Sequence, residues 1–84
     1  MRPHEVYMHV GLLDSVPTGG IQRRKIMDFI LSLREHPNRR GDFTDKDASL
    51  RERQVKIIGD YAITYWLDAP VWIVMVVDVR LADK

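Results

Sequence analysis

The sequence predicts a small α+β domain, in which one twisted antiparallel sheet carries a helix on one face. Two apolar runs, residues 61–67 and 71–77, are dense in β-branched and aromatic side chains and are separated by Asp68-Ala69-Pro70. A third segment, residues 19–36, repeats apolar residues at helical spacing. Two shorter segments, residues 5–13 and 50–58, have the composition of strands. The expected order is therefore strand, helix and a three-strand meander.

The two long apolar runs should pair as the central hairpin of the sheet, because Asp and Pro favour a turn between them. Apolar residues occupy odd and even positions in both runs, which indicates burial on two faces. A two-residue tip would move one strand's side chains to the opposite face, so the sequence alone leaves the register open. A three-residue tip at 68–70 places these residues on one face: Ala62, Thr64, Trp66, Val74, Val76, Asp78 and Arg80.

Residues 19–36 should form one amphipathic helix. Thr18 is a suitable N-cap, and Pro37 disfavours helical backbone in the residue before it. One face of the helix should lie on the sheet through Ile26, Phe29, Ile30 and Leu33.

The remaining segments complete the sheet. Residues 5–13 alternate apolar and polar side chains as a first strand, and residues 38–49 are polar and are expected to form a loop. In residues 50–58, Arg51 and Arg53 occupy odd-numbered positions, as Val55 and Ile57 do, so a regular strand would place all four side chains on one face. Gly59-Asp60 suits a tight connection into the central hairpin.

Composition limits the classes of function. The 84 residues are expected to form a single domain, 1–84, with room for a shallow surface site rather than an enclosed cavity. The absence of cysteine and of a long apolar run favours a cytoplasmic protein without a membrane partner. Charge is uneven: residues 23–56 hold ten basic and six acidic residues, a net charge of +4, within a chain of net charge +1.

Three histidines, His4, His9 and His36, have no spacing typical of a metal site, and we expect neither a metal nor another cofactor. Trp66 and Trp72 flank the predicted hairpin tip. They would serve either as anchors for a partner or as packing residues, and the sequence leaves both readings open.

The chain resembles the RelE/ParE superfamily of bacterial toxin–antitoxin toxins over residues 20–83. The resemblance lies in Leu33-Arg34-Glu35-His36-Pro37 at the helix end, in the GDYAITYW segment at 59–66 and in the closing DVRLAD segment at 78–83. It implies a small α+β domain with an open sheet face, and an antitoxin protein that wraps and blocks the toxin. RelE-like members cut mRNA at the ribosome without a metal, whereas ParE-like members inhibit DNA gyrase.

Carried over residue by residue, the resemblance implies a catalytic set of Arg53, Lys56 and Arg80. The strand tyrosine of the family's G-x-Y motif is followed by a phosphate-binding arginine in RelE-like nucleases, but here that position is Ala62. The C-terminal tyrosine of some members also has no counterpart. The cationic side chains of Arg53, Lys56 and Arg80 are of the types that bind a phosphate and stabilise its developing charge. Tyr61 and Tyr65 are better explained as strand aromatics.

Three functions remain open. The first is a toxin that represses translation by cleaving mRNA at the ribosome. The second is a ParE-like gyrase inhibitor, and the third is a degenerate module that only binds a partner or a second copy of itself. The helix covers one face of a sheet that is apolar on both, so a cognate antitoxin is the expected cover for the other.

Overall fold

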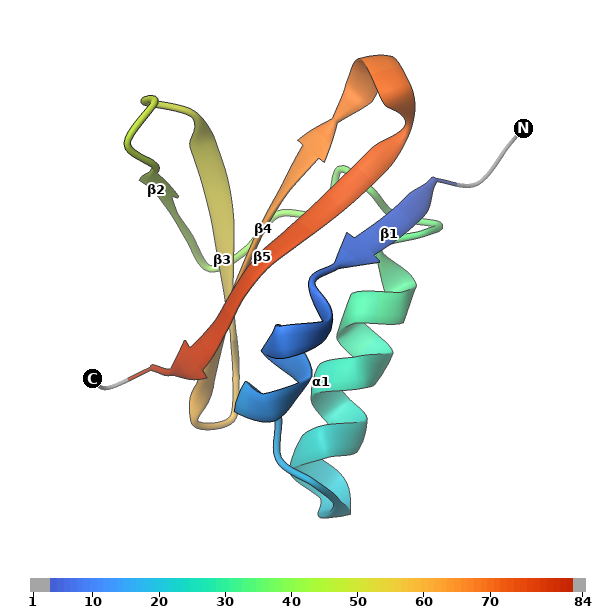
Figure 1. The fold of residues 1–84 in the computed structure, drawn as a ribbon, viewed down its shortest axis with the longest axis vertical. Coiled ribbons are helices and arrows are strands. Elements are labelled where there is room, and N and C mark those ends of the chain that lie inside the picture. The colour runs from blue at the N-terminus through green and yellow to red at the C-terminus, as the bar shows by residue number, and fades with distance from the viewer. Residues whose placement is uncertain (1–3, 83–84) are drawn as a thin grey trace.

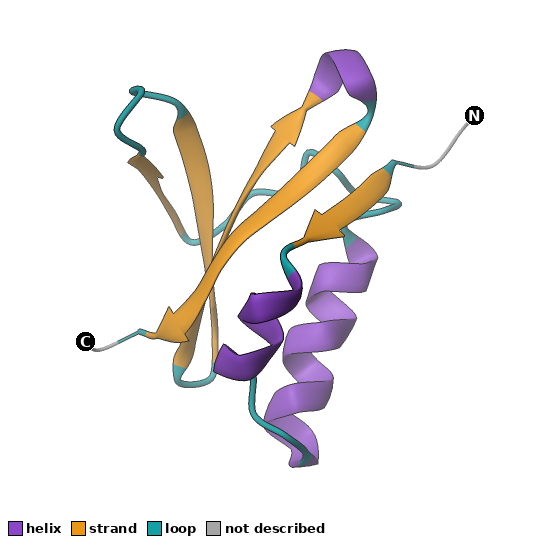
Figure 2. Cartoon of the chain, viewed as in Figure 1, coloured by secondary structure: helices purple, strands orange, loops and turns teal. Residues whose placement is uncertain are grey.

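The computed structural model describes residues 4–82, which form one α-helix, two short 3₁₀ helices and a five-stranded sheet (Figures 1 and 2). None of the helices within this range is long and apolar enough to cross a membrane. In chain order the elements are β1 (Glu5–Met8), η1 (Val10–Ser15), α1 (Gly20–Ser32), β2 (Phe43–Lys46), β3 (Glu52–Ile58), β4 (Tyr61–Asp68), η2 (Ala69–Val71) and β5 (Ile73–Leu81).

The strands lie in the order β1-β5-β4-β3-β2. The α+β class, the meander β3–β4–β5 and a helix on one face are confirmed. The expectation of a wholly antiparallel sheet is wrong in one pair, because β1 runs parallel to β5. β4 occupies one edge of β5, so the first strand of the chain pairs with the edge that remains, and the sheet is mixed.

The β4–β5 hairpin has an irregular register. At the tip, Asp68 pairs with Ile73 across η2, so Trp66 lies opposite Met75. Residues 69–72 lie between this pair, so the tip is longer than both the two-residue and the three-residue tips that the sequence left open. Trp66 does not share a face with Val74 or Val76. A register shift between Thr64 and Tyr65 changes the pairing farther along the hairpin. Beyond it the even-numbered residues of the two strands pair with each other, as they would after a three-residue tip, with Ala62 opposite Arg80 and Thr64 opposite Asp78.

Helix α1 covers the sheet with the face that the sequence predicts. Ile26, Phe29 and Ile30 are buried, as is Leu33 just after the helix. They pack on the residues of β4 and β5 that point toward the helix, which are Ile63, Tyr65, Val74, Val76 and Val79.

Both ends of α1 differ from the prediction. The N-cap is Gly19, which makes no side-chain capping bond, rather than Thr18. The α-helix ends at Ser32, and the N–H groups of Leu33, Arg34 and Glu35 donate to carbonyls three residues earlier. This tighter turn ends the helix ahead of Pro37.

The predicted polar loop 38–49 contains an unexpected strand, β2, which pairs with β3 at the sheet edge. Gly41 leads into it, and its N–H donates to the side chain of Gln54. A Cβ on Gly41 would lie 2.3 Å from the carbonyl oxygen of Val55, so only glycine allows this close approach of the two backbones.

The first strand is shorter than predicted because η1 begins at Val10. His9 is the N-cap of η1, and its Nδ1 accepts a hydrogen bond from the Gly11 N–H. Each tryptophan packs within the chain: the Arg51 guanidinium lies 4.0 Å from the Trp66 ring centroid, and the Trp72 ring lies 4.6 Å from that of His4.

Candidate functional site

The face of the sheet opposite α1 carries a shallow hollow of about 270 Å³. Strands β2, β3, β4 and β5 all contribute to it, because the side chains at directly paired positions point to the same side of a sheet. Its floor includes Val55 and Thr64, which are buried although they lie outside the main core. The lining residues are Phe43, Asp45, Arg53, Val55, Ala62, Thr64, Asp78, Arg80, Leu81 and Ala82.

Two of the three predicted site residues, Arg53 and Arg80, line this hollow. Arg53 is held by Asp45, directly opposite on β2, through Nε–Oδ1 and Nη2–Oδ2 bonds of 2.8 and 3.0 Å. This bidentate pair raises the pKa of Arg53 above its ordinary value, and the charge of Asp78 acts in the same direction.

Arg80 pairs with Asp78 on the same strand. Asp83 is a second acidic residue close to Arg80 in the sequence, and it lies outside the described residues. The hollow therefore contains a row of alternating charges from Asp45 through Arg53 and Asp78 to Arg80, with a net charge of zero. We call these four residues the charged row. Between the two arginines, β4 contributes only the small side chains of Ala62 and Thr64.

The third predicted site residue, Lys56, lies on the opposite face of the sheet. It pairs with Ile63, which is buried under the helix, and it lines a hollow on the helix side. Its Nζ is 3.5 Å from Asp42 Oδ1. Asp42 also accepts a 2.7 Å hydrogen bond from the Ile57 N–H, which is the main reason that its pKa is lowered. The fold thus places Arg53 and Arg80 in the same hollow and places Lys56 on the opposite face of the sheet.

Neither tyrosine of the G-x-Y region reaches the hollow. Tyr65 is 1% exposed on the helix side, and its hydroxyl donates to the Arg39 carbonyl at 2.7 Å. Burial raises its pKa to about 12, so it is a poor proton donor or acceptor near neutral pH. Tyr61 is half-buried against the same core. Both are strand aromatics, as their sequence context indicates.

The chemistry available in the hollow follows from the charged row. Two guanidinium groups can bind and stabilise a phosphate once it replaces their carboxylate partners. In the hollow the titratable proton acceptors are the same two carboxylates, Asp45 and Asp78. Within residues 4–82, no three His, Asp or Glu side chains are grouped as metal ligands.

Sequence reasoning missed three features of this site. Phe43 and Asp45 were assigned to a loop, because the FTDK segment is short and mostly polar. A signal for separating Lys56 was present: it lies three residues from Arg53, and an odd spacing on a regular strand points to opposite faces. The register shift that aligns Ala62 with Arg80 has no sequence signature that we recognise.

Comparisons with known proteins agree with this architecture. No family model matches the sequence, and no curated protein matches it. Among solved structures, the chain is similar to one in the crystal structure of the archaeal RelE–RelB complex from Pyrococcus horikoshii OT3. The TM-score is 0.74 at 15% sequence identity, and the alignment covers 98% of each chain. The predicted resemblance is therefore confirmed at the level of structure: the chain has a RelE-like fold.

Proposed function

We propose that this protein is the cytoplasmic toxin of a toxin–antitoxin pair, and that it represses translation by binding and cleaving mRNA at the ribosome. The observation that carries the proposal is a RelE-like fold over nearly the whole chain, with Arg53 and Arg80 directed into one hollow on the open sheet face. The archaeal protein with the similar fold was solved as a complex with RelB, which supports a protein antitoxin as the partner here.

In this proposal, the scissile phosphate displaces a carboxylate from the charged row. The guanidinium groups then stabilise the charge that develops on the phosphate oxygens. The displaced carboxylate of Asp45 or Asp78 accepts the proton of the 2′-hydroxyl, whose oxygen attacks phosphorus. A cyclic phosphate forms, and the 5′-oxygen leaves with a proton from water. A metal ion takes no part in these steps.

A second candidate is an inhibitor that acts by binding, such as a ParE-like inhibitor of DNA gyrase. Two observations favour it. Both arginines are already neutralised by aspartates, and Ala62 stands where RelE-like nucleases carry an arginine. A neutral hollow beside the exposed Phe43 suits a protein surface as well as a phosphate.

The test is to induce the chain alone in bacteria. Growth arrest with mRNA cut at codons supports the nuclease, whereas arrest with a DNA-damage response and intact mRNA supports gyrase inhibition. No arrest contradicts both toxin functions.

Variants then assign the chemistry to residues. Arg53→Ala or Arg80→Ala should lower the rate of mRNA cleavage about a hundredfold or more, because each removes a donor to the charge that develops in the transition state. Lys46→Ala is the matched control, because Lys46 is an exposed cation on β2 outside the hollow. Cleavage that persists unchanged in Arg80→Ala removes Arg80 from the site.

A further inference from the structure

A second hollow, of about 350 Å³, lies on the helix side of the sheet. Three cations from three separate segments line it: Lys25 from α1, Arg39 from the loop after the helix, and Lys56 from β3. We call it the basic groove. These residues are far apart in the sequence, so their convergence is a product of the fold.

The groove differs from the open-face hollow in its balance of charge. Asp28 is the acid in its lining, and Asp42 stands beside Lys56. Three cations therefore face two acids, a net charge of +1, whereas the charged row is neutral. The excess positive charge makes the basic groove the more attractive of the two for an anion approaching from solvent.

Arg39 is held in place within the groove. Its guanidinium carbon lies 5.1 Å from the centroid of the Phe29 ring, and its Nη1 donates to Ser32 Oγ at 3.2 Å. Contact with a ring face leaves the other guanidinium N–H groups to bind oxygen atoms, a geometry that favours phosphate. Lys25 and Lys56 add two flexible ammonium donors, so the groove offers cations to more than one phosphate of a chain.

We propose that the basic groove binds the phosphate backbone of single-stranded RNA. The choice of RNA rests on the proposed function, and the groove adds to it a second contact region on the face opposite Arg53 and Arg80. An acidic protein segment is the competing occupant, and the experiment below separates the two.

The test measures the affinity of the purified chain for a fluorescent oligouridine over a range of salt concentrations. The double variant Lys25→Gln/Lys56→Gln should bind about tenfold more weakly at low salt. The slope of log affinity against log salt should fall in magnitude by about 0.7 for each cation removed, or about 1.4 in all.

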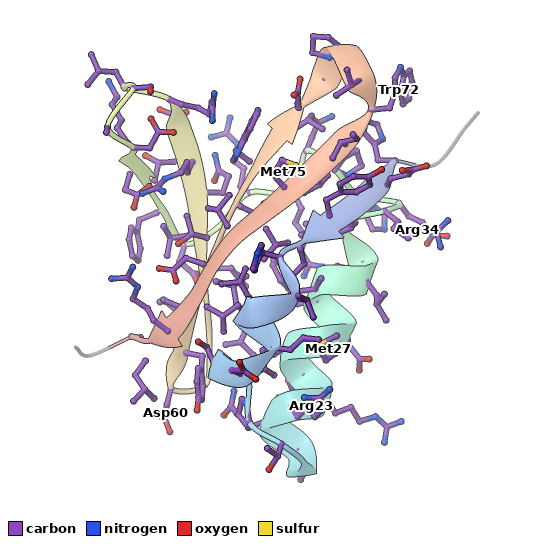
Figure 3. The ribbon with its side chains drawn as sticks, viewed as in Figure 1. Arg23, Met27, Arg34, Asp60, Trp72 and Met75 are labelled. Carbon is purple, nitrogen blue, oxygen red and sulfur yellow. The ribbon has the colours of Figure 1, made fainter. Side chains whose placement is uncertain are left out.

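Matched controls lie on or just after the same helix. Arg24 and Arg34 are exposed and outside the groove lining, and Arg34 projects outward from the molecule (Figure 3). The double variant Arg24→Gln/Arg34→Gln removes two positive charges, as the test variant does, and we expect it to retain the wild-type slope. Asp28→Asn should act in the opposite direction and raise RNA affinity about threefold, an effect that partial unfolding would not produce.

Wild-type affinity and slope in the double variant would overturn the proposal. A second outcome would also overturn it: the double variant loses binding to a polyglutamate peptide but keeps its binding to RNA. The groove would then be a binding site for an acidic protein. Growth arrest is not a readout here. If the chain binds RNA through the groove but does not arrest growth, the proposed toxin function is contradicted and the proposed RNA contact stands.

Discussion

Tyr65 connects the central strand of the sheet to the helical layer and to the loop after α1. Its ring packs edge-to-face on Phe29 with the centroids 5.5 Å apart, and its hydroxyl reaches the carbonyl of Arg39. The same loop residue extends its guanidinium over Phe29 into the basic groove. A single buried hydroxyl therefore helps to position a proposed RNA-binding cation.

This contact predicts a pH dependence of stability. Burial raises the pKa of Tyr65 to about 12 from the ordinary 10.0, so the folded state favours the protonated phenol. The contribution of the protonated Tyr65 to the free energy of unfolding is fully present below pH 10 and is lost as the pH rises toward 12. Urea unfolding should show that the difference in stability between wild type and Tyr65→Phe, about 1 kcal/mol at neutral pH, shrinks through this window. A difference that is independent of pH between 9 and 12 would contradict the assignment.

The placement of the site residues was only partly predictable. Arg53 has the parity of Val55 and Ile57, so its position on one face with them follows from the alternation of a strand. Its proximity to Arg80 depends on the register shift in β4–β5, which has no sequence signature that we recognise. Sequence spacing therefore predicts the face on which Arg53 lies, but it does not predict that Arg80 lies beside it.

At the scale of elements, α1 holds the sheet in place through one stripe of side chains. That stripe was predictable because helical spacing and burial agree at Ile26, Phe29, Ile30 and Leu33. Strand β2 was not predictable, because an edge strand has only one neighbour and needs few apolar residues. The hydrogen bonds of β2 to β3 make this polar segment a strand, with the close approach at Gly41 at its start.

The stripe predicts opposite outcomes for two leucines two positions apart. Leu33 is 0% exposed and Leu31 is 59% exposed. Leu33→Asp buries an unpaired charge in a small domain, which should unfold it at 25 °C, since stability margins are only about 5–15 kcal/mol. Leu31→Asp should leave the melting temperature within a few degrees of wild type. Circular dichroism melts check both, and a cooperative melt near wild type for Leu33→Asp would contradict the packing described.

At the scale of the whole molecule, the two faces of the sheet are covered unequally. The helix and η1 lie together on one side (Figure 1). On the other side the exposed Phe43 and Leu81 border the hollow, and Met75 and Trp66 are only half-buried. Because exposed apolar side chains border this neutral hollow, a protein surface is a suitable cover for this face. The proposed antitoxin would block the charged row by burying it.

The open face therefore predicts how a single substitution would release the partner. Phe43 is 53% exposed, so Phe43→Lys should change stability little while it places a charge within the proposed contact. Affinity for the co-expressed antitoxin, measured by calorimetry with the purified proteins, should fall about thirtyfold or more if Phe43 is a hot spot. Val10→Lys is the control, because Val10 is 73% exposed in η1 on the helix side. If Phe43→Lys binds as tightly as Val10→Lys, the antitoxin covers some other surface, and the open face is left to the target alone.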